Sequence, residues 1–377
     1  MNPTELLKGY DRTHLSVGVL GGHSALDVCA GAKAQGLRTV AVVEKGRDRT
    51  YATYYRMRDG RGSIGEIIRV KKFADVLESS IQEQLRKLNT IFVHSRYFWV
   101  YFEEPEKVER EFRLPIFGSR SLLKLEERDQ PYNQYHLLRD AGIRTPKIYA
   151  SPKDIDIGRV VIVKAREAQR RYERGFFLAT ASDFDVRAEE QVKRGLITEE
   201  GLKNAVIEEF IIGAPVNFNF FHSPLTRELE LLGTDTRRQT NLDGFLRMIA
   251  PDQEWAAQFV PLKMVETGHI AVTVKESLLE KAFELGERFL KATRSTRCDP
   301  TGRGIIGPFA LQGAVVTEEG REEIVIFDVS MRIPGSPGTA ATPYTTYLYG
   351  RPMSIGERCA LEIKRAADAS RLEEIIT

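Results

Sequence analysis

Residues 309–332 read FALQGAVVTEEGREEIVIFDVSMR, and this stretch decides the fold expected for the second half of the chain. Two apolar runs rich in β-branched residues lie on either side of Thr317-Glu318-Glu319-Gly320. Such runs favour strands, and a four-residue connection with glycine is typical of a β-hairpin. We therefore expect an antiparallel hairpin with strands at 309–316 and 323–329.

Polar residues recur at alternate positions where the second strand of this hairpin ends. Asp328, Ser330 and Arg332 fall on one face, because side chains alternate along a strand. Gln312, on the first strand, could lie across from them. Hard oxygen ligands hold Mg²⁺ and arginine stabilises a phosphoryl group in transfer, so this face suits a Mg²⁺–triphosphate site. A solvated polar face of an edge strand is the alternative that the same alternation allows.

The rest of the second half shows the same mixture of strand and helix patterns. Strands that follow one another at short spacing indicate an α+β fold with much antiparallel sheet. The expected elements are strands at 160–164, 206–212, 216–221 and 228–233, of which the last three are expected to form one antiparallel set, and helices at 122–141, 275–292 and 354–367.

The first half alternates short β-rich runs with helical patterns. Strand, helix and strand at this spacing indicate a parallel, doubly wound domain. Gly36 is well placed to end the first helix. The expected elements are strands at 15–20, 39–43 and 90–93, and helices at 25–35 and 73–88.

Two polar turns follow strands of this first half. Gly22, His23 and Ser24 open a helix, and helix N-termini bind anions through free N–H groups and the helix dipole. The alternative interpretation is structural, with Ser24 capping the helix, and it is compatible with anion binding. His94 and Ser95 follow the strand at 90–93 and should lie at the same sheet edge, where ligands of such sheets bind.

Three segments of the middle of the chain have charged residues that suit a nucleotide. Lys164 ends the apolar run VVIVK and is either a phosphate contact or an edge residue with its amine in solvent. Four arginines lie in 166–174, which could clamp phosphate or form a solvated loop. Glu208 and Glu209 precede an apolar stretch and a glycine, which could lie along an adenine ring or be a solvated strand end.

Composition excludes several classes of protein. The 377 residues allow two to three domains, and 42% hydrophobic and 29% charged residues are ordinary for a globular protein. A net charge of +2 does not favour nucleic-acid binding, and no apolar run reaches the about 20 residues of a membrane span. The N-terminus has no apolar signal region, and Cys29, Cys298 and Cys359 are too far apart for a metal motif. We expect a cytoplasmic protein with buried free thiols.

Taken in order, several of these segments resemble the ATP-grasp superfamily. The segments are VIVK (161–164), IEEFIIG (207–213) and FDVSMR (327–332), which match a strand lysine, an adenine hinge and an acid-x-Asn-x-Arg strand. The helix end DAGIRTPK (140–147) is similar to the usual entry into the nucleotide subdomain. The resemblance implies an N-terminal doubly wound parallel α/β domain at 1–121. It also implies an ATP-grasp domain of two subdomains at 122–377, with nucleotide binding at about 146–214.

A closer resemblance covers almost the whole chain and is to the archaeal formate-dependent AICAR ligases, the FAICAR synthetases. It implies a ligase that uses ATP and formate to formylate AICAR through formyl phosphate, in the synthesis of IMP. It also implies Mg²⁺, with Mn²⁺ as an alternative, and a homo-oligomer, a trimer or a hexamer. The segments that carry it are GGHSALDVCAGAKAQGL (21–37), FGSRSLLKLEERD (117–129), IEEFIIGAPVNFNFFHSPL (207–225), LLGTDTRRQTNLDGFLR (231–247), ETGHIAVTVKESLL (266–279), IGPFALQ (306–312) and PYTTYLYGRPMSIGERCALEIK (343–364).

The resemblance also assigns roles to individual residues. The implied catalytic residues are Arg332, His269 and Arg237. Those implied to bind ATP are Lys164, Glu208, Glu209, Ile211, Asn217 and Arg174. Those implied to bind AICAR or formate are His23, Ser24, Ser95, Arg238 and Thr267, and those implied to hold the metal are Gln312 and Asp328.

The chain departs from the family pattern at four places. A glycine-rich phosphate loop is replaced by AREAQRRYERGFF, in which Gly175 is the glycine that is left, and side chains there obstruct close approach of backbone N–H groups to phosphate. Tyr97 replaces a small hydroxyl residue of the nucleotide pocket, Asp328 replaces a glutamate, and IPGSPGT follows Arg332. Two alternatives therefore stay open, a divergent paralogue that binds a purine nucleotide without this turnover and a ligase for another carboxylate and amine.

Overall fold

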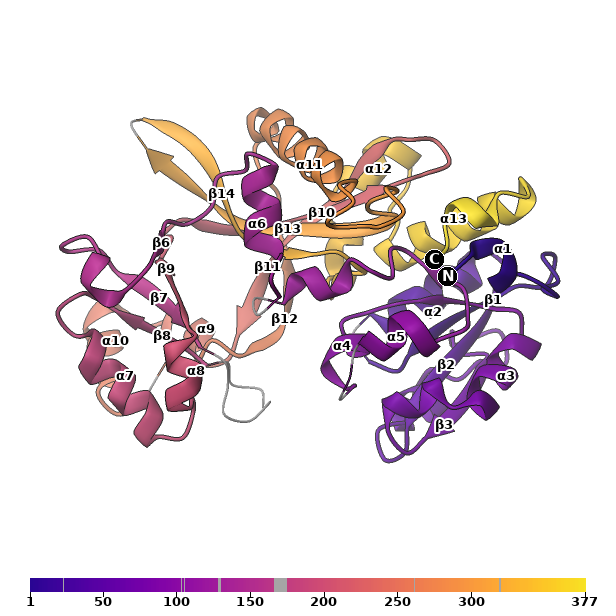
Figure 1. Ribbon diagram of the computed structural model, residues 1–377, viewed down its shortest axis with the longest axis horizontal. Coiled ribbons are helices and arrows are strands. Elements are labelled where there is room, and N and C mark those ends of the chain that lie inside the picture. The colour runs from indigo at the N-terminus through magenta and orange to yellow at the C-terminus, as the bar shows by residue number, and fades with distance from the viewer. Residues whose placement is uncertain are drawn as a thin grey trace.

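The computed structural model describes residues 1–22, 24–102, 104, 106–127, 130–165, 175–260, 262–318 and 320–377, and it contains three sheets (Figure 1). The first sheet is parallel, with the strand order β3-β2-β1-β4-β5. Because β1 lies in the middle and the chain winds out to both sides, the predicted doubly wound domain is confirmed. Its strands are β1 (Ser16–Leu20), β2 (Arg38–Glu44), β3 (Glu66–Val70), β4 (Thr90–Val93) and β5 (Ile116–Phe117).

Helices lie around this parallel sheet and include the C-terminal helix of the chain. Helix α2 ends at Ala34, and Gly36 follows with a φ of 75°, as predicted for the residue that ends it. The elements of this part are α1 (Pro3–Leu6), α2 (Ala25–Ala34), the π-helix η1 (Thr50–Tyr54), η2 (Phe73–Leu77), α3 (Ser79–Lys87), α4 (Tyr97–Val100), α5 (Glu106–Glu111), α13 (Ile355–Asp368) and η7 (Leu372–Glu374).

Helices α2 and α13 cross at a pair of glycines. A Cβ atom added to Gly31 would lie 2.2 Å from the Glu357 nitrogen, and one added to Gly356 would lie 2.5 Å from the Asp27 carbonyl carbon. The two backbones can approach this closely because neither position has a side chain. The C-terminal helix therefore packs on the N-terminal sheet, across the predicted domain boundary at residue 121, which stays a prediction.

The second sheet is small and antiparallel, with the order β6-β9-β7-β8. It has its own apolar core, which includes Val161, Val163, Phe177 and Ile207. The elements of this part are β6 (Ile148–Tyr149), η4 (Pro152–Asp154), β7 (Val161–Lys164), β8 (Phe176–Ala179), α7 (Phe184–Lys193), α8 (Glu199–Lys203) and β9 (Val206–Glu209). Before them in the chain come η3 (Leu123–Glu126) and α6 (Gln134–Asp140), which pack on the core of the third sheet.

The third sheet is antiparallel, with the order β12-β11-β10-β13-β14, and lies across the top of the view in Figure 1. Alternation along β10 divides its side chains between two faces: Phe218 and Phe220 belong to the core that includes Phe289 of α11, and Asn217 and Asn219 lie on the opposite face. The elements are β10 (Ala214–His222), β11 (Leu229–Gln239), α9 (Leu242–Phe245), α10 (Ala250–Ala257), β12 (Glu266–Ala271), η5 (Glu276–Leu278), α11 (Leu279–Thr293), β13 (Gly307–Glu318), β14 (Arg321–Ser330), η6 (Pro337–Ala341) and α12 (Tyr344–Tyr349).

The predicted hairpin at 309–332 is confirmed as β13 and β14. The ladder extends to the pair Glu318 and Arg321, so both strands reach further into the connection than the pattern indicated. The expected helices at 275–292 and 354–367 are also present, as η5 with α11 and as α13.

Two long helices predicted from the sequence are wrong. The described residues of 122–141 form the two short helices η3 and α6, because Pro131 cannot lie inside a helix and the Asn133 side chain caps a new helix by accepting from the Tyr135 N–H at 3.1 Å. The stretch 73–88 is divided at Glu78, which has an extended backbone. Asp75 accepts from the Lys71 and Lys72 N–H groups there and favours the short turn η2.

The strand predictions for the middle of the chain need two corrections. The segment 206–212 does not join 216–221 and 228–233 in one sheet, because β9 ends at Glu209 and pairs with β6 and β7. The segment 266–271, for which no strand was predicted, is the edge strand β12. In both cases the pairing partner is far away in sequence, and a local pattern does not identify it.

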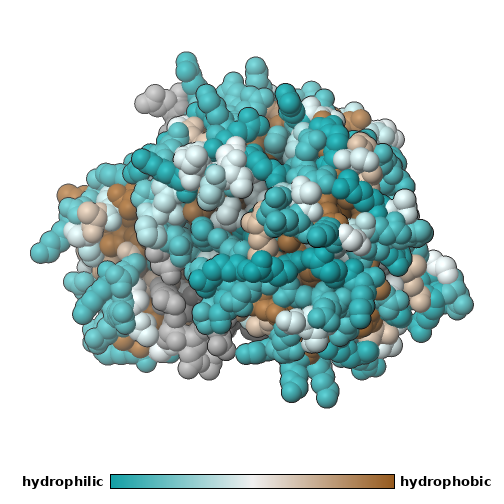
Figure 2. Space-filling model, turned by 45° about the vertical axis from the view of Figure 1, so that its right-hand side comes forward, coloured by the Kyte–Doolittle hydropathy of each residue, from teal (hydrophilic) through white to brown (hydrophobic). Residues whose placement is uncertain are grey.

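The surface and the thiols agree with the composition. Hydrophilic residues cover most of the face drawn in Figure 2, with smaller apolar areas between them. Within the described ranges, no helix combines the length and the apolar character that a membrane crossing requires. Cys29, Cys298 and Cys359 are free and buried, as predicted.

Candidate active site

A row of polar residues crosses four strands of the third sheet. Asp235 on β11 lies opposite Asn217 on β10, Asn217 lies opposite Gln312 on β13, and Gln312 lies opposite Asp328 on β14. Directly opposed residues of an antiparallel ladder point to the same face. The sheet register therefore brings together four residues that are up to 111 positions apart in sequence, because 328 minus 217 is 111.

A β-bulge follows the outer pair of this row. The register shifts between Gln312 and Gly313, so that Gly313 lies opposite Ile326 while Gln312 lies opposite Asp328. A bulge bends its strand and re-aims the side chain next to it. The Gln312 amide donates to the Ser330 hydroxyl at 3.0 Å, which places Ser330 on the same face, as the alternation predicted.

Arg237 provides the positive charge nearest to this outer pair. Its guanidinium donates to the Gln312 side-chain oxygen, and its Nη2 lies 3.8 Å from Asp328 Oδ2. Its Nε lies 3.2 Å from the Glu266 carboxylate. Two oxygens from adjacent strands thus face one cation, and this geometry suits a divalent metal as well as a guanidinium. Among the described residues, no group of three or more His, Cys, Asp or Glu side chains has metal-ligand geometry. The candidate metal ligands are one carboxylate, from Asp328, and one amide oxygen, from Gln312.

His269 lies at the other end of the row, on the edge strand β12. Its Nδ1 is hydrogen-bonded to Asp235, and its Nε2 lies 3.0 Å from Glu266 Oε1. Burial opposes protonation of this imidazole, but the hydrogen bonds to the two carboxylates outweigh burial and raise its pKa to about 9. Burial would also raise the pKa of the Asp235 carboxyl, yet hydrogen bonds from His269 and Asn219 hold that pKa below its usual range.

Arg332 lies just beyond β14 and is paired with an acid that sequence reasoning missed. Its Nη2 lies 3.5 Å from Glu126 Oε2, and the other Glu126 oxygen accepts from the Met331 N–H at 2.7 Å. Arg96 approaches the same carboxylate at 3.5 Å. Burial raises the pKa of Glu126 while Arg332 and Arg96 lower it, and burial lowers the pKa of Arg332. Glu126 therefore holds Arg332 beside the strand end.

The predicted adenine and phosphate residues lie in the second sheet. Lys164 and Glu208 form a buried ion pair between β7 and β9, and the Tyr135 hydroxyl donates to Glu208 Oε2 at 3.1 Å. Glu209 points elsewhere, with Arg159 at 3.6 Å, and Ile211 is half-buried in the connection to β10. The predictions for Arg174 and for the rest of 166–174 lie outside the described residues.

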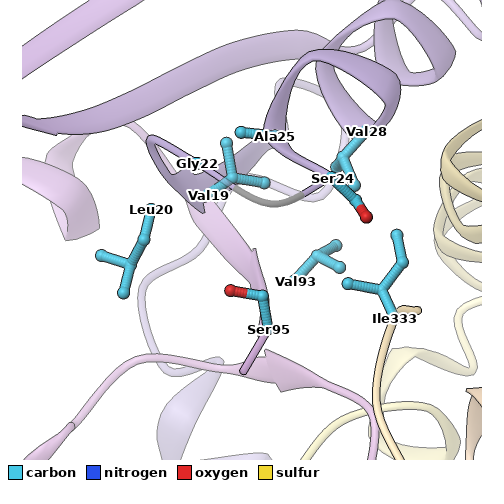
Figure 3. A pocket seen from close by; sticks show the side chains of 9 residues that line it. All are labelled: Val19, Leu20, Gly22, Ser24, Ala25, Val28, Val93, Ser95 and Ile333. Atoms are coloured by element: carbon cyan, nitrogen blue, oxygen red, sulfur yellow. The ribbon is translucent and has the colours of Figure 1, made fainter. Parts of the chain in front are cut away.

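The turn after β1 and the residues after β4 meet at one sheet edge, as predicted. Gly22, Ser24 and Ser95 line a cavity of ≈ 10 Å³, close to the space of one water molecule (Figure 3). Val93, at the end of β4, and Ile333, beyond β14, also line this cavity. The prediction for His23 lies outside the described residues.

Two side chains restrict the space at this turn. The Ser24 hydroxyl donates to the Pro334 carbonyl at 2.6 Å. Ser24 occupies the N-cap position, but its oxygen accepts no capping hydrogen bond from an N–H of α2, so the predicted side-chain cap is wrong. The Tyr97 ring lies so close to Gly22 that a Cβ atom added to Gly22 would be 2.1 Å from the ring. Gly22 has a φ of 155°, which a residue with a side chain rarely adopts.

Arg238 and Thr267 do not join the polar row. Arg238 is exposed and follows Arg237, so it points to the other face of β11. The Thr267 hydroxyl donates to the Arg238 carbonyl at 3.2 Å on the exposed side of the β11–β12 ladder.

Four polar residues of the site were missed in the sequence: Asp235, Glu266, Asn219 and Glu126. Asp235 and Arg237 alternate in TDTRR, and this spacing could have shown that they share a face. Asn219 has the same relation to Asn217. No local signal marks Glu126 or Glu266, whose partners come from other elements.

Comparison with protein families gives two matches that together cover most of the chain. A model described as "Domain of unknown function (DUF1297)" matches residues 183–377, and one described as "Protein of unknown function (DUF1246)" matches residues 17–149.

Solved structures share the architecture. The IMP biosynthesis protein PurP from Thermococcus kodakaraensis has a TM-score of 0.69 and 25% identity, over 96% of this chain and 100% of that chain. N5-carboxyaminoimidazole synthetase from Staphylococcus aureus has a TM-score of 0.54 and 13% identity, over 93% of this chain and 77% of that chain, which shows the shared fold alone.

Relatives with a name match this chain from end to end. A 5-formaminoimidazole-4-carboxamide-1-(beta)-D-ribofuranosyl 5'-monophosphate synthetase of Methanopyrus kandleri is 38% identical over 374 residues, which are 99% of this chain and 98% of that protein. The synthetase of the same name from Methanocaldococcus jannaschii is 37% identical over 376 residues, again 99% and 98% of the two chains. This chain has the ATP-grasp fold and belongs to the family of the 5-formaminoimidazole-4-carboxamide-1-(beta)-D-ribofuranosyl 5'-monophosphate synthetases.

Proposed function

We propose that this protein is an ADP-forming carboxylate–amine ligase that formylates AICAR to FAICAR with ATP and formate, in the synthesis of IMP. The observation that carries the proposal is the full-length similarity to synthetases of that product, at 38% identity over 99% of the chain. The cross-strand row from Asp235 to Asp328 supports it, since it puts two carboxylates and two amides on one face of the sheet, with the cationic Arg237 in contact with Gln312 and Asp328.

The reaction has two steps. A formate oxygen attacks the γ-phosphorus of ATP, the bond from that phosphorus to the β,γ-bridging oxygen breaks, and ADP leaves. The amine nitrogen of AICAR then attacks the formyl carbon, the bond from carbon to the phosphate oxygen breaks, and phosphate leaves while the amine loses a proton. Neither step needs a protein nucleophile, because positioning and charge stabilisation can lower both barriers.

The chain offers residues for each part of this chemistry. In this proposal Lys164 contacts phosphate, and Glu208 and Glu209 with the segment at Ile211 hold adenosine, within a nucleotide subdomain at about 146–214. Arg332 and Arg237 stabilise the phosphoryl group in transfer. The residues at the N-terminal turn hold AICAR; they are His23, Ser24 and Ser95.

Gln312 and Asp328 would hold a divalent cation, Mg²⁺ or Mn²⁺. Their oxygens already face a common cation, the Arg237 guanidinium, which stands where a metal ion would bind. When bound, the metal would neutralise charge on the triphosphate. Asn217 lies next to Gln312 in the row and would contact the same nucleotide.

The proposal is tested with purified protein, ATP, formate and AICAR. We expect ADP and phosphate to be released only when all three substrates and Mg²⁺ are present, and FAICAR to form in equal amount. Asp328→Asn should lose most of this turnover, whereas Asp252→Asn, an exposed acid on α10, should keep it. Absence of turnover together with tight binding of ATP or AICAR would refute the assignment of these substrates.

A second function has one observation in its favour. The Tyr97 ring on Gly22 and the ≈ 10 Å³ cavity beside it leave little room for AICAR at this turn, which suits a relative without this turnover. Calorimetry separates the two functions, because binding of a purine monophosphate without binding of Mg-ATP favours the second.

We further propose that the protein acts in the cytoplasm as a homo-oligomer, a trimer or a hexamer. Exposed apolar side chains gather in and around the excursion between β11 and β12, and a second copy would cover them. They are Leu246, Met248, Ile249, Trp255, Phe259, Val260, Leu262, Met264 and Ile270.

A further inference from the structure

Asp235 is the most buried member of the polar row, with 1% of its surface exposed. One carboxylate oxygen accepts from the Asn217 amide at 2.9 Å and the other from the Asn219 amide at 2.6 Å. The His269 ring is its third partner. A carboxylate that accepts from three donors on the two strands that flank β11 is satisfied as an anion and cannot turn away easily.

This arrangement determines which nitrogen of His269 carries a proton toward Asp235. An ionised carboxylate only accepts, so Nδ1 must be the protonated nitrogen of that hydrogen bond. The ring is then fixed with Nε2 on the opposite side, where it meets Glu266. The Ser336 hydroxyl, 3.3 Å from Nδ1, lies on the same side as Asp235.

The two carboxylates that contact His269 differ in one decisive respect. The Asp235 side chain is buried, whereas 39% of the Glu266 side chain is exposed, and Glu266 is shared with Arg237. An anion that enters the site can displace an exposed carboxylate but not a buried one that has three partners. The Glu266 oxygen on Nε2 therefore stands where an oxygen of an anionic substrate would lie.

We propose that Asp235 is a positioning residue, whose carboxylate holds His269 with Nε2–H turned into the site to donate a hydrogen bond to an anionic substrate oxygen. The substrate class is a small carboxylate or the acyl phosphate formed from it, and this part of the inference rests on the proposed function. His269 is then a cationic donor and not a general base.

The charges around His269 agree with this role. The groups that face the ring are Asp235 and Arg237 on β11, Glu266 on β12 and Ser336 before η6. Its pKa of about 9 lies above the about 6.5 of an unfolded chain. The stability that the protonated pair contributes to the fold is therefore fully present below about pH 6.5 and is lost as the pH rises through about 9.

The test combines nuclear magnetic resonance with kinetics on the full chain. We expect ¹⁵N signals of His269 to show a protonated Nδ1 at all pH values below 9 and a titration midpoint near 9. In Asp235→Asn the midpoint should fall toward about 6.5, while Asp252→Asn leaves it unchanged. Turnover of Asp235→Asn should fall about 30-fold at pH 8, where a pKa near 6.5 leaves about 3% of His269 protonated, and recover in large part at pH 6, where His269 is protonated again.

Several results would overturn the inference. A His269 midpoint that does not move in Asp235→Asn, or a loss of turnover that is equal at pH 6 and pH 8, shows a merely structural role. If Asp235→Asn does not fold, wild-type signals that show an unprotonated Nδ1 or an unprotonated Nε2 at pH 7 refute the proposal without any variant. A moved midpoint in a protein that has no turnover of formate and AICAR keeps the positioning role and refutes the proposed function instead.

Discussion

Tyr97 is one of the positions at which the sequence is expected to depart from the family pattern, and it lies among the residues that the structure describes. Its ring packs on Phe73 with centroids 5.3 Å apart and on Tyr101 at 4.6 Å, so the ring is held over Gly22 by other aromatic rings. The space at the nucleotide turn is therefore set by an aromatic cluster and not by a loop that can move alone.

Replacing Tyr97 by serine should open this turn. We expect Tyr97→Ser to lower the KM for AICAR or to tighten binding of a purine monophosphate by about 10-fold, since removal of a ring that fills a pocket restores contact area worth about 1–2 kcal/mol. Calorimetry with the monophosphate measures the effect. Tyr347→Ser, at a site that is 68% exposed, is the control, and weaker binding to Tyr97→Ser than to the control would contradict the prediction.

Lys164 and Glu208 permit a separation of structural from functional roles. Lys164→Met leaves the Glu208 carboxylate buried without its cation, which should cost about 3–5 kcal/mol in the free energy of unfolding. The double variant Lys164→Met/Glu208→Gln removes both charges and should regain most of that stability in urea unfolding.

The binding of ATP then decides the role of the lysine. If Lys164 contacts phosphate, ATP affinity stays low in the double variant although stability returns. Recovery of both properties would show that the ion pair serves only the fold.

At the scale of elements, the crossing of α2 and α13 ties the C-terminal helix to the N-terminal sheet. Gly31→Val should destabilise the protein by about 1–3 kcal/mol or more, because its side chain would overlap the backbone at Glu357. Thermal unfolding measures the loss.

Gly244→Ala is the matched control for this crossing, because it adds a methyl group in α9 where no other heavy atom lies within 4 Å. Equal melting temperatures for the two variants would mean that the helices can move apart at no cost.

Element prediction succeeded where one periodic pattern was enough. The hairpin β13–β14, the parallel order around β1 and the helix α13 follow from alternation and from helical spacing. It failed at 122–141, where a long charged stretch suggested one helix but Pro131 and the Asn133 cap divide it. Local chain breakers outweigh helix-favouring composition there, because a missing N–H and a strong alternative cap both act against helix propagation.

At the scale of the whole molecule, we expect the apolar segment that connects β11 and β12 to form the contact between copies of the chain. Trp255 and Phe259 are 64% and 67% exposed, with ring centroids 5.0 Å apart. The variant Trp255→Lys/Phe259→Lys should shift the protein from a trimer or hexamer to smaller species in light scattering after size exclusion.

The control for assembly is Ile157→Lys, which changes an apolar residue that is fully exposed on another part of the chain. A mass that is the same for the double variant and the control would exclude this segment as the contact between copies.

The sequence by itself determined the fold class, the order of the segments that carry the chemistry and the faces of single strands. Lys164, Gln312 and Asp328 could be selected from local patterns and from the family resemblance. Periodicity is a property of neighbouring residues, so a single chain segment is enough to show it.

Only the tertiary structure decided which of these residues meet. The partnership of Asp235 with His269, that of Arg332 with Glu126 and the position of Tyr97 depend on pairings between remote segments. Sheet order and register are set by the burial of whole faces against other elements, and a shift of one residue would turn every side chain to the other face. The site is therefore a consequence of the packing of the complete chain, whereas its parts are visible in the sequence.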